Sequence, residues 1–252
     1  ATDISELTLL LAKQPHRINM GHIKQMAKET IVMVIQSLEA YVNKDMELAR
    51  KVMGMDDAID DLFDIVKNEL IEHIRSDASS GSQAIDLLMI AKYYERIGDH
   101  ALNMLEAAEE LKEKDLAFSK SAWHELKVLM AAVDEIISLS FSAFQDNDLE
   151  KAYQVEPLEQ VIDDLKEKLR IHHILRLQQG SCSIEVGFVW SDVLTNLERV
   201  ADHCSNVAGR IIERHSRNFL IHNYTDNVRE IYKDFEAQFD MYSKKYALPE
   251  MK

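Results

Sequence analysis

Apolar side chains recur along this chain at alternating spacings of three and four residues. Such spacing places them on one face of an α-helix and leaves polar residues on the opposite face. Short polar or glycine-containing segments interrupt the pattern and mark the expected turns. We therefore predict helices over about residues 17–42, 45–76, the segment between 82 and 114, 121–144, 148–178, the segment between 183 and 216, and 225–246.

One stretch of the third predicted helix occurs a second time in the sixth. Glu95-Arg96-Ile97-Gly98-Asp99-His100 returns 103 residues later as Glu198-Arg199-Val200-Ala201-Asp202-His203, as positions 95 and 198 show. The preceding helix keeps the same offset, since Ile59-Asp60-Asp61-Leu62 matches Ile162-Asp163-Asp164-Leu165 without a gap. A constant offset over some sixty residues indicates an internal repeat.

Each repeat contains three helices joined by short turns, and short turns make neighbouring helices antiparallel. The sequence thus predicts an all-α protein of two tandem three-helix bundles with a C-terminal helix. The expected parts are an N-terminal arm (1–16), repeat 1 (17–114), repeat 2 (120–216) and a helical tail (217–252). The tail has no counterpart in the repeat. We expect it to dock on its own chain, with a dimer contact through its aromatic residues as the alternative.

Acidic residues lie four positions apart on the second and third helices of both repeats. Antiparallel packing of these two helices brings the acids to one surface, where up to five carboxylates and an amide meet. Oxygen-rich clusters suit hard cations such as Mg²⁺ or Mn²⁺, and such a site can also hold iron or zinc. The predicted ligands are Glu95, Asp99, Asp56 and Asp60 in repeat 1 and Glu198, Asp202, Glu159 and Asp163 in repeat 2, with Asp64, Asn103, Glu167 and Asn206 as outer candidates.

A simpler interpretation of the same acids remains open. Helical proteins often expose acidic faces, and Arg96 and Arg199 follow the acids closely enough to neutralise them. His100 and His203 are adjacent to the acids, and either metal binding, helix capping or a partner contact would account for them. Four such motifs in duplicate register favour the metal-binding interpretation over the simpler one.

Composition narrows the class of protein further. Seven glycines and three prolines in 252 residues are too few for a chain rich in strands and turns. The net charge of −15 argues against nucleic acid as a partner. Two cysteines provide no disulfide framework, and no apolar run approaches the roughly 20 residues of a membrane span. No zinc-protease, phosphate-loop or serine-hydrolase motif is present in the sequence, so we expect no enzymatic activity.

The duplicated E-R-[IV]-x-D-H-x-x-N motif, preceded by acids on the previous helix, resembles the PhoU family over about residues 17–216. This resemblance implies two three-helix repeats that bind metal clusters through Glu95, Asp99, Glu198 and Asp202. It also implies a regulatory rather than catalytic role in phosphate uptake.

The tail adds a finer resemblance. Together with Leu194–Asn206 it is similar to the cytoplasmic PhoU-like region of Na⁺/phosphate cotransporter proteins, which would place a membrane domain upstream of Ala1. The main expectation is therefore a cytoplasmic regulatory domain at the inner face of the plasma membrane, in contact with a membrane phosphate transporter.

Two alternatives to this expectation remain. One is a free-standing PhoU protein that acts on an ABC phosphate transporter and a sensor kinase, with a homodimer as a further option. The other is a structural helical scaffold whose acids bind no specific metal.

Overall fold

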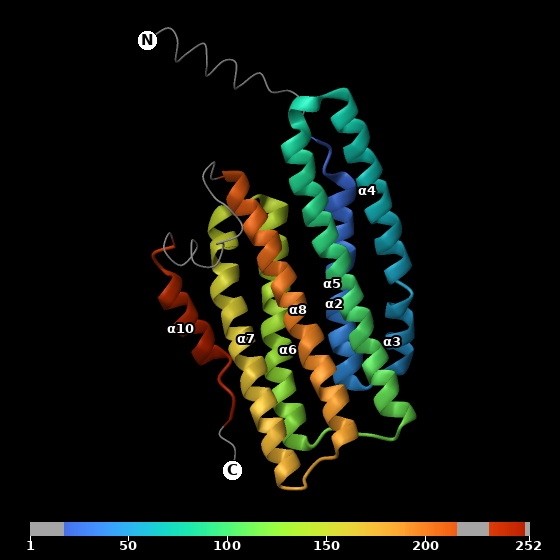
Figure 1. Cartoon of the computed structure of the whole chain (residues 1–252), viewed down its shortest axis with the longest axis vertical. Helices are drawn as coiled ribbons and strands as arrows, with labels where there is room; N and C mark the ends of the chain where they lie inside the picture. Colours follow the sequence, from blue (N-terminus) through green and yellow to red (C-terminus); the bar gives the residue numbers. More distant parts are fainter. Residues whose placement is uncertain (1–17, 216–231, 250–252) are drawn as a thin grey trace.

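The computed structural model describes residues 18–215 and 232–249, and all regular structure in these ranges is helical (Figure 1). This confirms the predicted all-α class. The elements are α2 (Gly21–Asn43), α3 (Met46–Met53), α4 (Asp56–Ser76), the 3₁₀ helix η1 (Ala78–Ser80), α5 (Gly81–Glu113), α6 (Lys120–Asp146), α7 (Leu149–Gln178), α8 (Ile184–His215) and α10 (Phe235–Lys245). None of the helices within those ranges combines the length and the apolar character needed to cross a lipid bilayer.

The breaks that the sequence predicts after the first helix of each repeat have identical local causes. Asp45 and Asp148 are the N-caps of α3 and α7, and each carboxylate accepts hydrogen bonds from the two backbone N–H groups two and three residues ahead. Lys44 and Asn147 end the preceding helices in the left-handed conformation, with φ of 55° and 52°. A side-chain cap and a left-handed residue are the usual start and stop of a helix.

The second predicted helix is wrong as a single element in repeat 1. The chain breaks at Gly54 and Met55, so residues 45–76 form α3 and α4 rather than one helix. Repeat 2 has Pro157 at the position equivalent to Gly54, and α7 nevertheless runs unbroken through it. Glycine loses more conformational entropy in a helix than other residues, which favours the break in repeat 1.

Each repeat packs its helices in the same register. His22 Nδ1 of α2 lies 2.7 Å from Glu69 Oε1 of α4. The equivalent positions in repeat 2 hold the same pair with acid and base exchanged, since His172 Nδ1 of α7 lies 2.9 Å from Glu125 Oε1 of α6. Residues 103 positions apart thus occupy equivalent places in the two repeats, both along each helix and in the contacts between helices.

The two bundles share one hydrophobic core. Helices α5 and α8, the third of each repeat, make the most extensive contact of any helix pair in the described ranges and lie side by side in Figure 1. The first helices of the two repeats, α2 and α6, are also in contact, and Lys24 Nζ of α2 donates to the Gln145 backbone oxygen of α6 at 2.9 Å. Buried residues from both repeats therefore form a continuous cluster, and each bundle covers an apolar face of the other.

The described part of the tail docks on its own chain. Helix α10 packs against α7, and the Tyr153 and Tyr232 rings stack with centroids 5.5 Å apart. Tyr246 donates to the Ala131 backbone oxygen of α6 at 3.3 Å, and Lys245 Nζ lies 2.8 Å from Glu135. The expected docking is confirmed for residues 232–249. The N-terminal arm and residues 217–231 of the tail lie outside the described residues, and the four part boundaries stay predictions.

Candidate functional site

Four of the predicted acids of repeat 1 face one another across the α4–α5 pair. Gly98 of α5 lies beside the first turn of α4, since a Cβ placed there would lie 3.4 Å from Ile59 Cδ1 and 3.7 Å from Asp56 Oδ1, which are ordinary contact distances. Burial raises the pKa of Asp56, and the charges of Asp60 and Asp99 raise it further. Burial and then the charges of Glu95 and Asp99 do the same to the pKa of Asp60. The four carboxylates therefore form one repelling group.

Repeat 2 holds the same arrangement in a more buried form. Burial raises the pKa of Glu159 to about 9, with additional effects from Glu156, Asp163, Asp202 and Glu198. The pKa of Asp163 is raised by burial and then by the charge of Glu198. The acids of α7 and α8 are thus close enough to influence one another's charge.

The glutamates of the two motifs are largely enclosed. Glu95 and Glu198 side chains are 15% and 12% exposed. One oxygen of each, Oε2, is buried and makes no hydrogen bond. Lys92 Nζ forms an ion pair with Glu95 Oε2, and Lys166 Nζ lies 3.0 Å from Glu198 Oε2. Each oxygen thus already has an ammonium group beside it, and a metal ion bound there would have to share the oxygen with that lysine or displace it.

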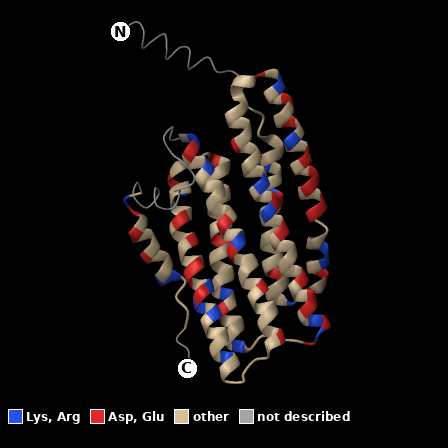
Figure 2. Ribbon diagram, viewed as in Figure 1, with Lys and Arg blue, Asp and Glu red and all other residues tan. Residues whose placement is uncertain are grey.

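Basic residues offset part of the acidic charge, as the simpler interpretation requires. Arg96 pairs with Asp99 at 3.3 Å and Arg199 with Asp202 at 3.1 Å. Figure 2 shows acidic and basic ribbon segments close together along α7 and α8. In each repeat four carboxylates face one such arginine and one lysine, Lys92 or Lys166. With all four carboxylates ionised, one divalent cation would balance the remaining charge of the group in repeat 1.

The donor set fits a hard divalent cation in its chemistry. As the side chains stand, however, no three His, Cys, Asp or Glu residues within the described ranges are close enough together to hold one ion. Binding would therefore require the carboxylates to rotate toward one another. The metal assignment, including the choice among Mg²⁺, Mn²⁺, iron and zinc, stays a prediction.

The four outer candidates have other partners. Asp64 pairs with Lys67, and Glu167 pairs with Arg170 at 2.9 Å. Asn206 donates to the Asp202 backbone oxygen at 2.8 Å. Asn103 donates to Asn196 Oδ1 of the other repeat at 3.3 Å.

The contact between repeats at the motif histidines is a feature that the sequence pattern does not indicate. The His100 and His203 rings stack with centroids 5.4 Å apart, and Tyr93 stacks on His203 at 5.9 Å. His100 Nδ1 also lies 2.9 Å from Asn196 Oδ1. These two histidines are repeat equivalents, so their stacking shows that α5 and α8 cross where the two motifs meet. In the sequence, the one hint of this contact is that the two histidines occupy equivalent positions in the two repeats.

Comparison with known proteins adds independent findings. The model of the PhoU domain matches the chain twice, over residues 23–108 and 126–211. PhoU homolog 1 of Thermotoga maritima, a phosphate-specific transport system accessory protein, is 29% identical over 210 residues, which are 82% of this chain and 86% of the relative. The PhoU homolog of Clostridium acetobutylicum is 33% identical over 107 residues, 42% of this chain and 49% of that protein.

Solved structures support the same fold. PhoU from Pseudomonas aeruginosa superposes with a TM-score of 0.71 at 22% identity, over 76% of this chain and 92% of that one. The phosphate transport system regulatory protein PhoU from Streptococcus pneumoniae gives 0.70 at 21% identity, over 79% and 94%. At these identities the likeness concerns the fold alone.

Proposed function

Because this chain belongs to the PhoU domain family, we propose that it regulates phosphate uptake by a membrane phosphate transport system. The observation that carries this proposal is the match of the family's domain to both repeats, which contain the two acidic motifs. The relatives named above are accessory proteins of phosphate transport systems. A contact with the transporter is thus the expected mode of action, and catalysis is not.

The relatives favour the accessory-protein hypothesis over a cotransporter domain. The Thermotoga maritima protein aligns with this chain over 86% of its own length and carries the accessory-protein name. The cotransporter hypothesis depends on the resemblance of the tail and Leu194–Asn206. The sensor kinase, a homodimer and the cytoplasmic location at the membrane's inner face stay predictions.

Metal binding is the second part of the proposal. Glu95, Asp99, Asp56 and Asp60 would hold one centre, and Glu198, Asp202, Glu159 and Asp163 the other. A bound divalent cation would remove the repulsion that raises the pKa of Asp56 and Asp60. It would also stabilise the α4–α5 and α7–α8 pairs and fix the surface that meets a partner.

Uptake of radioactive phosphate in the native host tests the regulatory role. Deletion of the gene is expected to leave uptake high in phosphate-rich medium, and the wild-type gene should restore repression. Unchanged uptake in the deletion strain would contradict the proposed function. Copurification separates the two hypotheses on the partner. Recovery of an ABC phosphate transporter with this protein supports the accessory-protein hypothesis, and recovery of a Na⁺/phosphate cotransporter supports the other.

Metal analysis of purified protein tests the centres. Glu95→Gln with Asp99→Asn should remove the metal of repeat 1 and leave that of repeat 2. Asp61→Asn with Asp164→Asn is the matched control, because these repeat-equivalent acids are exposed on α4 and α7 and make the same charge change. Equal metal content in both double variants would contradict the assignment.

A further inference from the structure

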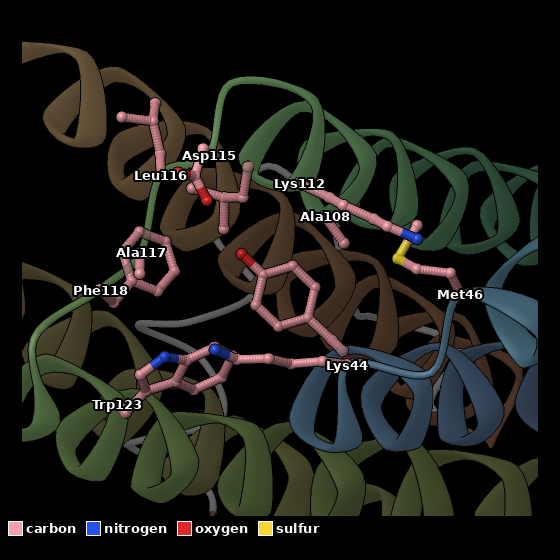
Figure 3. Close-up of a pocket in the computed structure, with 11 residues that line it drawn as sticks. Lys44, Met46, Ala108, Lys112, Asp115, Leu116, Ala117, Phe118 and Trp123 are labelled. Atoms are coloured by element: carbon pink, nitrogen blue, oxygen red, sulfur yellow. The ribbon is translucent and has the colours of Figure 1, made fainter.

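A pocket of about 280 Å³ opens where the two repeats are joined, at the opposite end of α5 from the α4–α5 turn (Figure 3). The end of α2, the start of α3, the end of α5, the linker and the start of α6 all contribute to it. Its lining residues are Tyr41, Lys44, Met46, Ala108, Leu111, Lys112, Asp115, Leu116, Ala117, Phe118 and Trp123. None of the predicted metal ligands is among them, so the pocket is separate from both acidic groups.

Aromatic rings form much of the wall. The Trp123 ring lies 5.6 Å from Tyr41 and 5.6 Å from Phe118, measured between centroids. Lys44 Nζ lies 5.6 Å from the centroid of the Trp123 ring, and Figure 3 shows its side chain extended toward that ring. Lys112 is a second exposed cation of the lining. The lining thus offers a flat ligand aromatic rings and two ammonium groups, with the carboxylate of Asp115 as its one acidic group.

The hydroxyl of Tyr41 has unused hydrogen-bonding capacity. This residue is only 2% exposed, and its oxygen is buried without any hydrogen-bond partner. Buried tyrosine hydroxyls usually find a partner, because an unpaired one loses its bonds to water. Burial also raises the pKa of Tyr41, which keeps the hydroxyl protonated as a donor. An acceptor atom of a ligand in the pocket would satisfy it.

Two lining residues adopt an unfavourable backbone conformation. Lys44 and Asp115 have φ of 55° and 52°, and both lie in the left-handed region that favours glycine or asparagine. Repeat 2 has Asn147 at the position of Lys44, a residue that tolerates this conformation. It also has Phe144 at the position of Tyr41. Lys44 and the hydroxyl of Tyr41 are therefore not needed to form this turn, because repeat 2 forms the equivalent turn with Asn147 and Phe144.

From these features we infer that the pocket binds a small flat organic anion, whose ring stacks on Trp123 while its charged group meets Lys44 and Lys112. Tyr41 donates a hydrogen bond to the bound molecule. A pocket of about 280 Å³ has room for a small ring system. This inference does not rest on the proposed regulatory function.

Calorimetric titration of the whole chain tests the inference. The probes are 1-naphthoate, for an aryl carboxylate, and adenosine 5′-monophosphate, for a nucleotide. Inorganic phosphate supplies charge without a ring, and 1-naphthalenemethanol supplies a ring without charge. At least one of the two flat anions should bind with Kd below 1 mM and at least tenfold more tightly than both controls. The flat anion that binds more tightly shows whether the natural ligand is an aryl carboxylate or a nucleotide.

The repeat itself supplies variants that keep the fold. Tyr41→Phe and Lys44→Asn install the residues of repeat 2, and Lys112→Gln changes an exposed side chain. The Tyr41→Phe, Lys44→Asn double variant and Lys112→Gln should each weaken the bound probe at least fivefold, with unchanged melting temperature for Lys112→Gln. A smaller loss in both variants, or no flat anion binding below 1 mM, would overturn the inference. Phosphate uptake plays no part in this assay, so its outcome is independent of the regulatory proposal.

Discussion

Removal of Arg176 should destabilise the fold far more than removal of an exposed ion pair. Glu125 is 2% exposed and Arg176 5% exposed, and Arg176 Nη1 lies 2.7 Å from Glu125 Oε2. The guanidinium also lies over the Trp190 ring, 5.3 Å from its centroid. Arg176→Met leaves a buried carboxylate whose remaining partner is His172 at 2.9 Å. A buried charge that loses its partner typically costs about 3–5 kcal/mol.

One contact reduces that figure here. His172 still donates to Glu125, so the carboxylate keeps one of its two partners. We therefore expect Arg176→Met to lower the free energy of unfolding by about 2–4 kcal/mol. Adding Glu125→Gln removes the charge that was left unpaired, so the double variant should recover at least about 1 kcal/mol of this loss.

Repeat 1 offers an exposed pair at the equivalent positions. His22 and Glu69 are 41% and 40% exposed, so Glu69→Gln should change stability by less than about 1 kcal/mol. Urea denaturation at pH 7, followed by circular dichroism, measures all four proteins on one scale.

Two results would refute this reasoning. One is a loss below about 1 kcal/mol for Arg176→Met, which would mean that Glu125 is not held by this pair. The other is a double variant no more stable than Arg176→Met alone, since it would show that packing rather than the unpaired charge sets the cost.

Four further predictions concern other parts of the fold. Gly98→Ala should stabilise the protein by about 0.5–1 kcal/mol, because a Cβ there makes ordinary contacts and repeat 2 already has Ala201. Gly187→Ala should instead destabilise it by about 1–2 kcal/mol, since the Cβ would lie 2.6 Å from His173 Nε2; urea denaturation of both variants checks the opposite signs. Burial, followed by the charge of Arg176, lowers the pKa of His173 below the 6.5 of the unfolded chain. Its contribution to stability is complete above pH 6.5 and is lost as the pH falls through the folded pKa. His173→Gln should therefore make the melting temperature fall less between pH 7.5 and 5.5, and an unchanged pH dependence would contradict this. Deletion of residues 232–252 should lower the melting temperature without changing the oligomeric state measured by light scattering, because the tail packs on α7; a monomer replacing a wild-type dimer would contradict docking on the same chain.

Local features of the sequence were sufficient to predict most of the helices and the internal repeat. Apolar spacing follows helical geometry, and Asp45 and Asp148 act through backbone groups two and three residues away. The apolar spacing, the capping aspartates and the acids all recur 103 residues later, so the sequence predicts equivalent helices and two equivalent acidic groups. Such inferences hold because each interaction lies within a helix or between helices joined by a short turn.

The break at Gly54 shows where local reasoning fails. Glycine in repeat 1 and proline in repeat 2 both weaken a helix, yet only the first ends one. Pro157 is buried, whereas Gly54 is exposed. The packing around each position decides between a break and a continuous helix, and this packing involves residues distant in sequence.

The relation between the repeats was decided by tertiary structure. The repeat predicts two similar bundles but does not indicate which faces meet. The structure stacks His100 on His203 and brings Asn103 into hydrogen-bonding contact with Asn196 of the other repeat. It also forms the pocket beside Trp123 from segments that are separate in the chain. A periodic pattern specifies the face that each helix buries, while the choice of partner depends on side-chain fit across the whole core.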